Sequence, residues 1–206
     1  MELVTRPESA GTAVPAVPAV PAMVTPASVK LRSTGADETR RLAGVMAALC
    51  IPGDVVLLAG DLGAGKTTFA QGFAAGLGVT EAVTSPTFTL VRQYPVGPAG
   101  PAGAADRLDS TQPIRILLHA DVYRLDHLNE IVDLGLGELV EDGAVALVEW
   151  GDVAEPILGE GSLAVRLTPG PDEADSERVI MVRPDGDTWT DRWGAMVGAL
   201  APWRSA

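Results

Sequence analysis

Residues 60–68, Gly-Asp-Leu-Gly-Ala-Gly-Lys-Thr-Thr, constrain the fold more than any other stretch of the chain. They match the pattern G-x-x-x-x-G-K-[S/T], a glycine-rich loop that cradles phosphate groups. The apolar run of residues 55–58 precedes the loop and is typical of a buried parallel strand. Phe69 and Phe73 follow it with the spacing of one helix face. The segment therefore predicts a strand, a phosphate-binding turn and a helix, in that order.

Each residue type in this loop suits phosphate chemistry. Glycines let the backbone adopt positive φ and approach a phosphate closely, and N–H groups at the start of the helix attract its oxygens. Lys66 can reach the terminal phosphates, and the Thr67 hydroxyl is a ligand for Mg²⁺. The alternative is a turn that caps a helix and binds nothing. We expect nucleotide contacts throughout the loop, at Asp61, Leu62, Gly63, Ala64, Gly65, Lys66, Thr67 and Thr68.

Two further apolar stretches finish in carboxylates, residues 114–121 at Asp121 and residues 144–149 at Glu149. Ligands of parallel sheets bind beyond the carboxyl ends of the strands, so both acids are expected to face the loop. One would hold Mg²⁺, directly or through water, and the other would orient water or hold a switch residue. A solvated strand end is the alternative for either acid taken alone.

Hydroxyl residues crowd around Pro86. Ser85 lies nineteen residues after Lys66, where many P-loop proteins place a segment that senses the γ-phosphate. Ser85 and Thr87 would then contact the nucleotide. A loop capped by its own Ser and Thr side chains is the alternative.

The order of the remaining patterns predicts an α/β, P-loop NTPase-like fold with a mostly parallel central sheet flanked by helices. Residues 163–168 and 177–182 alternate and predict an antiparallel strand pair near the C-terminus. Ser33 or Thr34 is expected to cap a first helix, and the P-loop helix is expected to end near Gly76 or Gly78. Helical spacing recurs in residues 128–139, interrupted by glycines, and in residues 189–200.

Composition indicates one globular domain in a chain of 206 residues. We expect a disordered Pro/Ala/Val-rich tail at residues 1–27, a single domain at residues 28–206 and a flexible insertion at residues 95–113. Because no membrane-spanning run and no secretory signal are present, we expect a cytoplasmic protein. The net charge of −12 disfavours direct binding of nucleic acid. Cys50, the only cysteine, is expected to be buried at a helix end.

Four segments together resemble the TsaE (YjeE) family of bacterial P-loop ATPases, over roughly residues 30–183. The loop alone is generic, and the other three segments make the resemblance specific. The segments are residues 60–69, residues 85–90 (Ser-Pro-Thr-Phe-Thr-Leu), residues 119–125 (His-Ala-Asp-Val-Tyr-Arg-Leu) and the pair Glu149-Trp150.

The resemblance implies an Mg²⁺-dependent ATPase that acts with the TsaD and TsaB proteins. Together they form the threonylcarbamoyl group on the adenosine next to the tRNA anticodon, and the ATPase does not transfer the group itself. Contact with tRNA would be indirect, through these partners. By the same likeness Lys66, Asp121 and Glu149 are catalytic, Thr67, Glu149 and Asp121 serve the metal, and Trp150 lies beside the nucleotide or a partner.

Other nucleotide-dependent functions fit the sequence less well. A GTPase would read guanine with Asn-Lys-x-Asp, but the only asparagine is Asn129 and no lysine follows Lys66. A small-molecule kinase would need an arginine-rich lid, and residues 95–113 carry only Arg107. A nucleotide-gated binding module without significant hydrolysis stays open. Arg124 is the candidate for an arginine that acts on the phosphates from within the chain.

Overall fold

The computed structural model describes residues 28–97, 113–125, 127–170 and 176–205. The expected N-terminal tail and most of the expected insertion lie outside these residues. At the near end of the insertion, Pro95 is still part of a strand, so the regular sheet reaches into the range assigned to the insertion.

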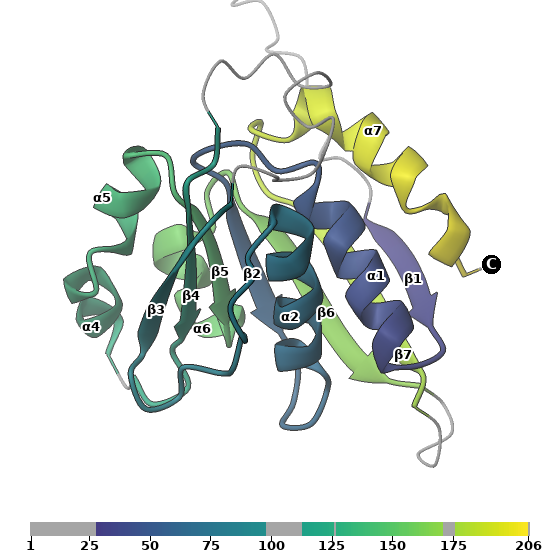
Figure 1. Ribbon diagram of the computed structural model, residues 1–206, viewed down its shortest axis with the longest axis horizontal. Helices are drawn as coiled ribbons and strands as arrows, with labels where there is room; N and C mark the ends of the chain where they lie inside the picture. Colours follow the sequence, from purple (N-terminus) through teal and green to yellow (C-terminus); the bar gives the residue numbers. More distant parts are fainter. Residues whose placement is uncertain (1–27, 98–112, 126, 171–175, 206) are drawn as a thin grey trace, which may run out of the picture.

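A seven-stranded sheet runs through the molecule in the order β1-β7-β6-β2-β5-β4-β3 (Figure 1). Strands β6, β2, β5 and β4 are parallel to their neighbours within this central group. Strand β7 pairs antiparallel with both β1 and β6, and β3 pairs antiparallel with β4. The predicted α/β class and the antiparallel pair near the C-terminus are confirmed. The strands are β1 (Val29–Ser33), β2 (Val55–Ala59), β3 (Val91–Pro95), β4 (Ile116–Asp121), β5 (Val145–Glu149), β6 (Leu163–Pro169) and β7 (Arg178–Pro184).

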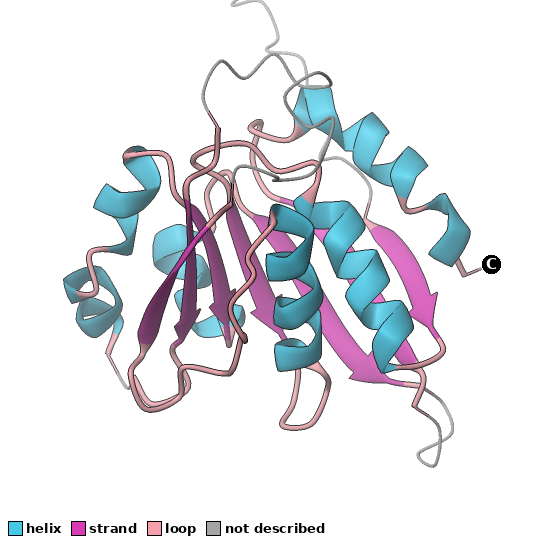
Figure 2. Cartoon of the chain, in the orientation of Figure 1, coloured by secondary structure: helices cyan, strands magenta, loops and turns pink. Residues whose placement is uncertain are grey.

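Helices cover both faces of the sheet (Figure 2). On one face α1, α2 and α7 pack on strand side chains such as Leu58 and Leu147. On the other face α4, α5 and α6 pack on Leu118 and Ala146. The sheet is therefore the middle of three layers, and each apolar face is buried. The helices are α1 (Ala36–Ala47), α2 (Lys66–Leu77), α4 (Leu128–Asp133), α5 (Leu136–Glu141), α6 (Gly151–Leu158), α7 (Thr190–Ala199) and the 3₁₀ turn η1 (Ala201–Trp203).

The P-loop helix α2 lies directly against α1, and glycines make this close approach possible. A Cβ on Gly72 would lie 2.2 Å from the carbonyl oxygen of Arg40. A Cβ on Gly76 would lie 2.6 Å from the Cα of Gly44 on the facing helix. Both atoms belong to the backbone of α1, which cannot move aside as a side chain can. These glycines therefore fix how α2, and the loop at its start, are seated.

The start of α1 differs from the sequence expectation, because neither Ser33 nor Thr34 is its cap. Gly35 is the N-cap residue, and no side chain caps the helix. Thr34 instead donates from its N–H and its hydroxyl to the Glu38 carboxylate, both at 2.6 Å. Ser33 is buried and shares a 2.8 Å hydrogen bond with the Thr39 hydroxyl. The carboxylate in the first turn thus reaches back to the chain before the helix.

Glycines mark two further helix boundaries. Helix α2 ends at Leu77, and Gly78 follows it with φ 92°, whereas Gly76 lies inside the helix. Residues 128–139, which show helical spacing in the sequence, form the two short helices α4 and α5. Gly135 separates them with φ 66°, a left-handed conformation that interrupts the helical path.

The C-terminal helix α7 spans nearly the predicted range and is joined to the domain by a buried ion pair. Arg192 donates to both carboxylate oxygens of Asp54, at 2.7 and 2.8 Å. Cys50 is buried at the end of α1 as expected, and burial raises the pKa of its thiol well above the usual value. Within the described residues, the helices are too short or too polar to span a lipid bilayer.

Candidate nucleotide-binding site

The glycine-rich loop joins β2 to α2, as the sequence predicts. Gly60 passes so close to β6 that a Cβ there would lie 2.4 Å from the carbonyl oxygen of Leu167. Gly65, the residue before α2, has φ 102°, a backbone conformation that residues with a side chain rarely adopt. The spacing of these glycines thus meets two separate demands, a close backbone contact at Gly60 and a left-handed residue at the helix start.

The Lys66 ammonium is folded back onto its own loop. Its Nζ donates hydrogen bonds to the carbonyl oxygens of Gly60 (2.7 Å) and Asp61 (3.0 Å). It also lies 4.0 Å from the centroid of the Trp150 ring, a cation–π contact. Desolvation lowers the pKa of Lys66, and the negative charge of Glu149 opposes that shift. A phosphate that reaches Lys66 would therefore displace neutral carbonyl acceptors, which bind an ammonium less strongly than an anion does.

Asp121 and Glu149 end the adjacent strands β4 and β5 and are paired in register. Each is only 3% exposed. The Thr67 hydroxyl, in the first turn of α2, lies 3.3 Å from Glu149 Oε1. Because β5 lies between β2 and β4, its last residue reaches the helix that begins after β2. The structure thus brings both acids to the edge of the sheet where the loop lies, and their chemical roles stay predictions.

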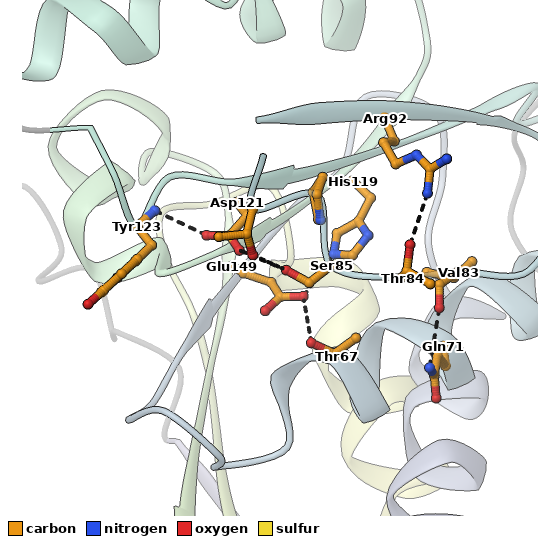
Figure 3. A network of polar contacts seen from close by, with 12 residues as sticks. Thr67, Gln71, Val83, Thr84, Ser85, Arg92, His119, Asp121, Tyr123 and Glu149 are labelled. Atoms are coloured by element: carbon orange, nitrogen blue, oxygen red, sulfur yellow. Dashed lines mark hydrogen bonds and ion pairs between the residues drawn. The ribbon is translucent and has the colours of Figure 1, made fainter. Parts of the chain in front are cut away.

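The Asp121 carboxylate is surrounded by hydrogen-bond donors (Figure 3). Its Oδ2 accepts a bond from the Ser85 hydroxyl at 2.8 Å. It accepts a second bond from the Thr87 hydroxyl, also at 2.8 Å. Its Oδ1 accepts a bond from the Tyr123 N–H at 3.1 Å. The two hydroxyls also lie 2.7 Å from each other. Ser85 and Thr87 are therefore held by a site acid, and the alternative in which they only cap their own loop does not describe their contacts.

The segment that carries these hydroxyls is fixed at both ends. Gln71 on α2 donates to the Val83 carbonyl oxygen at 3.2 Å, and Arg92 on β3 donates to the Thr84 hydroxyl at 2.9 Å (Figure 3). At the far end Leu90 has φ 62°, an uncommon value for a residue with a side chain. The Asp121 N–H donates to the Leu90 carbonyl oxygen at 2.8 Å. Residues 83–90 therefore form a short strap over the carboxyl ends of the central strands.

His119 is a site neighbour that the sequence patterns did not single out. It precedes Asp121 by two residues on β4, so both side chains lie on the same face of the sheet. Its ring is fully buried, and Nε2 lies 3.0 Å from Glu149 Oε1 (Figure 3). Among the described residues Nδ1 has no hydrogen-bond partner. The two-residue spacing from a strand-end acid was the signal that could have identified it.

Trp150 turns the chain sharply out of β5 into α6. It has φ 60°, and Gly151 after it packs on Leu57, where a Cβ would lie 2.6 Å from the Leu57 Cβ. The turn places the indole ring beside Lys66 and beside the Tyr123 ring, with 4.6 Å between the two ring centroids. Two aromatic rings thus form one wall of the site.

Most of the predicted site residues line a cleft of about 430 Å³. Asp61 and Ala64 are the predicted loop residues that do not line it. The Asp61 carbonyl oxygen accepts a hydrogen bond from Lys66, and the Ala64 carbonyl oxygen accepts one from Arg178. Tyr123 lines the cleft and was missed by the sequence patterns. Arg124 is absent from the lining, and its guanidinium lies 4.8 Å from the centroid of the Phe88 ring. The lining residues are Leu62, Gly63, Gly65, Lys66, Thr67, Thr68, Ser85, Thr87, Asp121, Tyr123, Glu149 and Trp150.

This cleft has the parts of a phosphate site in a P-loop protein. The glycine-rich loop precedes a helix N-terminus, a lysine and a threonine begin that helix, and two acids end neighbouring parallel strands. The fold and the site together define the class of P-loop NTPase-like α/β proteins.

Comparison with known proteins identifies the family within this class. Residues 33–179 match the family described as threonylcarbamoyl adenosine biosynthesis protein TsaE. The TsaE proteins of Bacillus subtilis and Streptomyces coelicolor are each 40% identical to this chain, over 161 and 152 residues. These alignments cover 78% and 73% of this chain and 89% and 93% of the relatives. The chain belongs to the TsaE family, which takes part in tRNA threonylcarbamoyladenosine biosynthesis.

A solved structure agrees with this assignment. The crystal structure of Bacillus subtilis YdiB superposes with a TM-score of 0.61 at 34% sequence identity. The match covers 85% of this chain and 95% of that one. Helix α7 lies beyond the residues that match the family.

Proposed function

We propose that the chain is the Mg²⁺-dependent ATP-binding and ATP-hydrolysing subunit that acts with TsaD and TsaB. In that role it supports formation of the threonylcarbamoyl group on the adenosine next to the tRNA anticodon, without transferring the group itself. Membership of the TsaE family supports the pathway. One observation carries the ATPase part of the proposal: the Thr67 hydroxyl at the start of α2 lies 3.3 Å from Glu149, beside the in-register Asp121.

The residues present fit a nucleotide with Mg²⁺. Hydroxyl and carboxylate oxygens are hard ligands of the kind that Mg²⁺ prefers. The described part of the chain contains no group of three or more His, Cys, Asp or Glu side chains that could hold a metal ion by themselves. Mg²⁺ commonly takes its other ligands from substrate phosphates and water. When bound, it would neutralise charge on the terminal phosphates.

The contacts divide the work between the two acids. Glu149 touches Thr67, so we assign it to the metal side of the site. Asp121 touches the strap through Ser85 and Thr87, so we assign it to the switch and to orienting the attacking water. Lys66, released from its carbonyl acceptors, would stabilise negative charge on the terminal phosphates.

Turnover by the chain alone should be slow. Arginine is absent from the residues that line the cleft in the described part of the chain. An arginine that reaches the transferred phosphoryl group commonly accelerates its hydrolysis, and it can come from a partner. We therefore expect TsaD and TsaB to raise the rate of ATP hydrolysis.

The test is ATP hydrolysis by the purified chain, alone and with TsaD, TsaB and tRNA, beside Lys66→Ala and Asp121→Ala. Each substitution should lower partner-stimulated turnover by about 100-fold or more, because the proposal gives Lys66 the charge of the terminal phosphates and Asp121 the attacking water. Glu155→Gln is the matched control, since that acid pairs with Arg183 outside the cleft. If ATP binds but every condition lacks Lys66-dependent turnover, the chain is a nucleotide-gated binding module. Transfer of phosphate to a small molecule would instead favour a kinase.

A further inference from the structure

Arg178, the first residue of β7, lies beside the phosphate-binding loop although more than a hundred residues separate them in the chain. Its Nε donates to the Ala64 carbonyl oxygen at 2.9 Å, and its Nη2 lies 3.4 Å from the Gly63 carbonyl oxygen. A third nitrogen, Nη1, donates to the carbonyl oxygen of Glu177 at 2.7 Å, which ties the guanidinium to the residue just before β7. We propose that Arg178 is a positioning residue that sets the orientation of the loop peptides for phosphate binding.

The planar peptide bond gives this contact its consequence. The C=O of Ala64 and the N–H of Gly65 belong to one planar trans unit and point in opposite directions. When Arg178 holds the Ala64 oxygen toward β7, the Gly65 N–H must point away from β7. Gly65 lines the cleft, and its φ of 102° is accessible to few other residues. The guanidinium therefore selects one of the several orientations that a glycine-rich loop can adopt.

The paired strands β6 and β7 support this interaction. Thr168 and Pro169 of β6 pair with Val179 and Arg178 of β7, at the end of the hairpin that faces the loop. On the same side, Gly60 approaches the Leu167 carbonyl oxygen, so the loop contacts the hairpin at its start as well as at its middle. Preorganised N–H donors bind an anion without first having to be ordered, and this raises affinity.

Arginine suits this position better than lysine. Its guanidinium carries several N–H donors in a fixed plane, so one side chain can bind the carbonyl oxygens of Ala64, Gly63 and Glu177 together. Lysine has a single ammonium on a flexible stem and cannot reproduce that fork. The guanidinium also places a positive charge behind the loop, where it favours an anion in front.

The inference deepens the proposed function and rests on it, and two measurements on the full chain separate the two. The first is the affinity for ADP and ATP in Arg178→Gln and Arg178→Lys. The second is hydrogen–deuterium exchange of the nucleotide-free chain. Arg183→Gln is the matched control, because Arg183 lies on the same strand but pairs with Glu155 and Asp185.

We expect Arg178→Gln to weaken the binding of both ADP and ATP on the order of tenfold, the equivalent of one lost charge-assisted hydrogen bond. The nucleotide affinity of Arg178→Lys should lie between those of Arg178→Gln and the wild type, and the affinity of Arg183→Gln should match the wild type. Exchange should rise in residues 60–68 and stay unchanged in α7, whereas a general loss of stability would raise it in both.

Wild-type nucleotide affinity in both Arg178 variants, or unchanged exchange in the loop, would overturn the positioning role. If the glutamine variant does not fold, the lysine variant decides by the same two measurements. If the wild-type chain binds no nucleotide, the proposed function fails, while the exchange comparison still decides whether Arg178 holds the loop.

Discussion

At the scale of single residues, the two site acids are alike in burial and different in company. Glu149 lies between the Thr67 hydroxyl and the ring of His119. Asp121 is enclosed by the hydroxyls of the strap and a backbone N–H. Because a carboxylate acts through the atoms it touches, these surroundings predict two separable losses when each acid is neutralised.

Neutralising each acid should therefore leave a different signature. With Glu149→Gln, the Mg²⁺ concentration needed for half-maximal ATP binding should rise by about tenfold, because an amide is a weaker magnesium ligand than a carboxylate. With Asp121→Asn, that concentration should change little while turnover falls by about 100-fold or more. A titration of ATP binding against Mg²⁺ measures the first effect and single-turnover hydrolysis the second. If both variants shift the Mg²⁺ requirement equally, the division of roles is wrong.

At the scale of elements, the seating of α2 against α1 is the contact that places the phosphate-binding loop. The two helices touch backbone to backbone at Gly72, Gly76 and Gly44. A side chain added at Gly72 or Gly76 must push the helices apart, and the start of α2 would move with them. The position of a site at the start of α2 thus depends on contacts that the helix makes further along its length, at Gly72 and Gly76.

Gly72→Ala should accordingly destabilise the fold by about 1–3 kcal/mol, because the new methyl group would overlap the Arg40 backbone. Gly198→Ala in α7 is the matched control, since a Cβ there meets no atom within 4 Å. That change should stabilise the protein by about 0.5–1 kcal/mol through the higher helix propensity of alanine. Urea unfolding of the two variants measures both effects. Equal shifts of the same sign would contradict the tight α1–α2 contact.

At the scale of the whole molecule, charge sets which partners the chain can meet directly. The chain has 15 lysines and arginines and 27 aspartates and glutamates, which gives a net charge of −12. Several of the arginines are engaged in ion pairs with those acids. The surface therefore offers little to a polyanion beyond the P-loop itself.

The purified chain alone should consequently show no measurable binding of tRNA at about 0.15 M salt, because non-specific affinity comes from neutralised phosphates. A mixture with TsaD and TsaB should bind tRNA through those proteins. Filter retention over a range of salt concentrations gives the comparison. Binding by the chain alone that weakens steeply as salt rises would show a direct electrostatic interface and contradict this expectation.

The loop, the strand-end acids and the fold class were predictable because each depends on residues that are near one another in the sequence. Glycine spacing, apolar runs and alternation report local backbone demands, and these were met at β2, α2, β6 and β7. The capping of α1 was predicted wrongly, since the buried Ser33 hydroxyl bonds to the Thr39 side chain and no side chain caps the N–H groups at the start of the helix. Arg178 escaped prediction because its contact with the loop joins residues more than a hundred positions apart. His119 and Tyr123 lie within two residues of Asp121, but the sequence patterns assigned them no role in the site.

The sequence by itself determined that a glycine-rich loop of the P-loop pattern would join a buried strand to a helix and that two acids would end apolar strands. Only the tertiary structure decided which groups meet. The order of strands put Glu149 next to Thr67, and the antiparallel hairpin brought Arg178 behind the loop. The physical reason is that hydrogen bonds across a sheet depend on strand order and register, which arise from the packing of the whole chain.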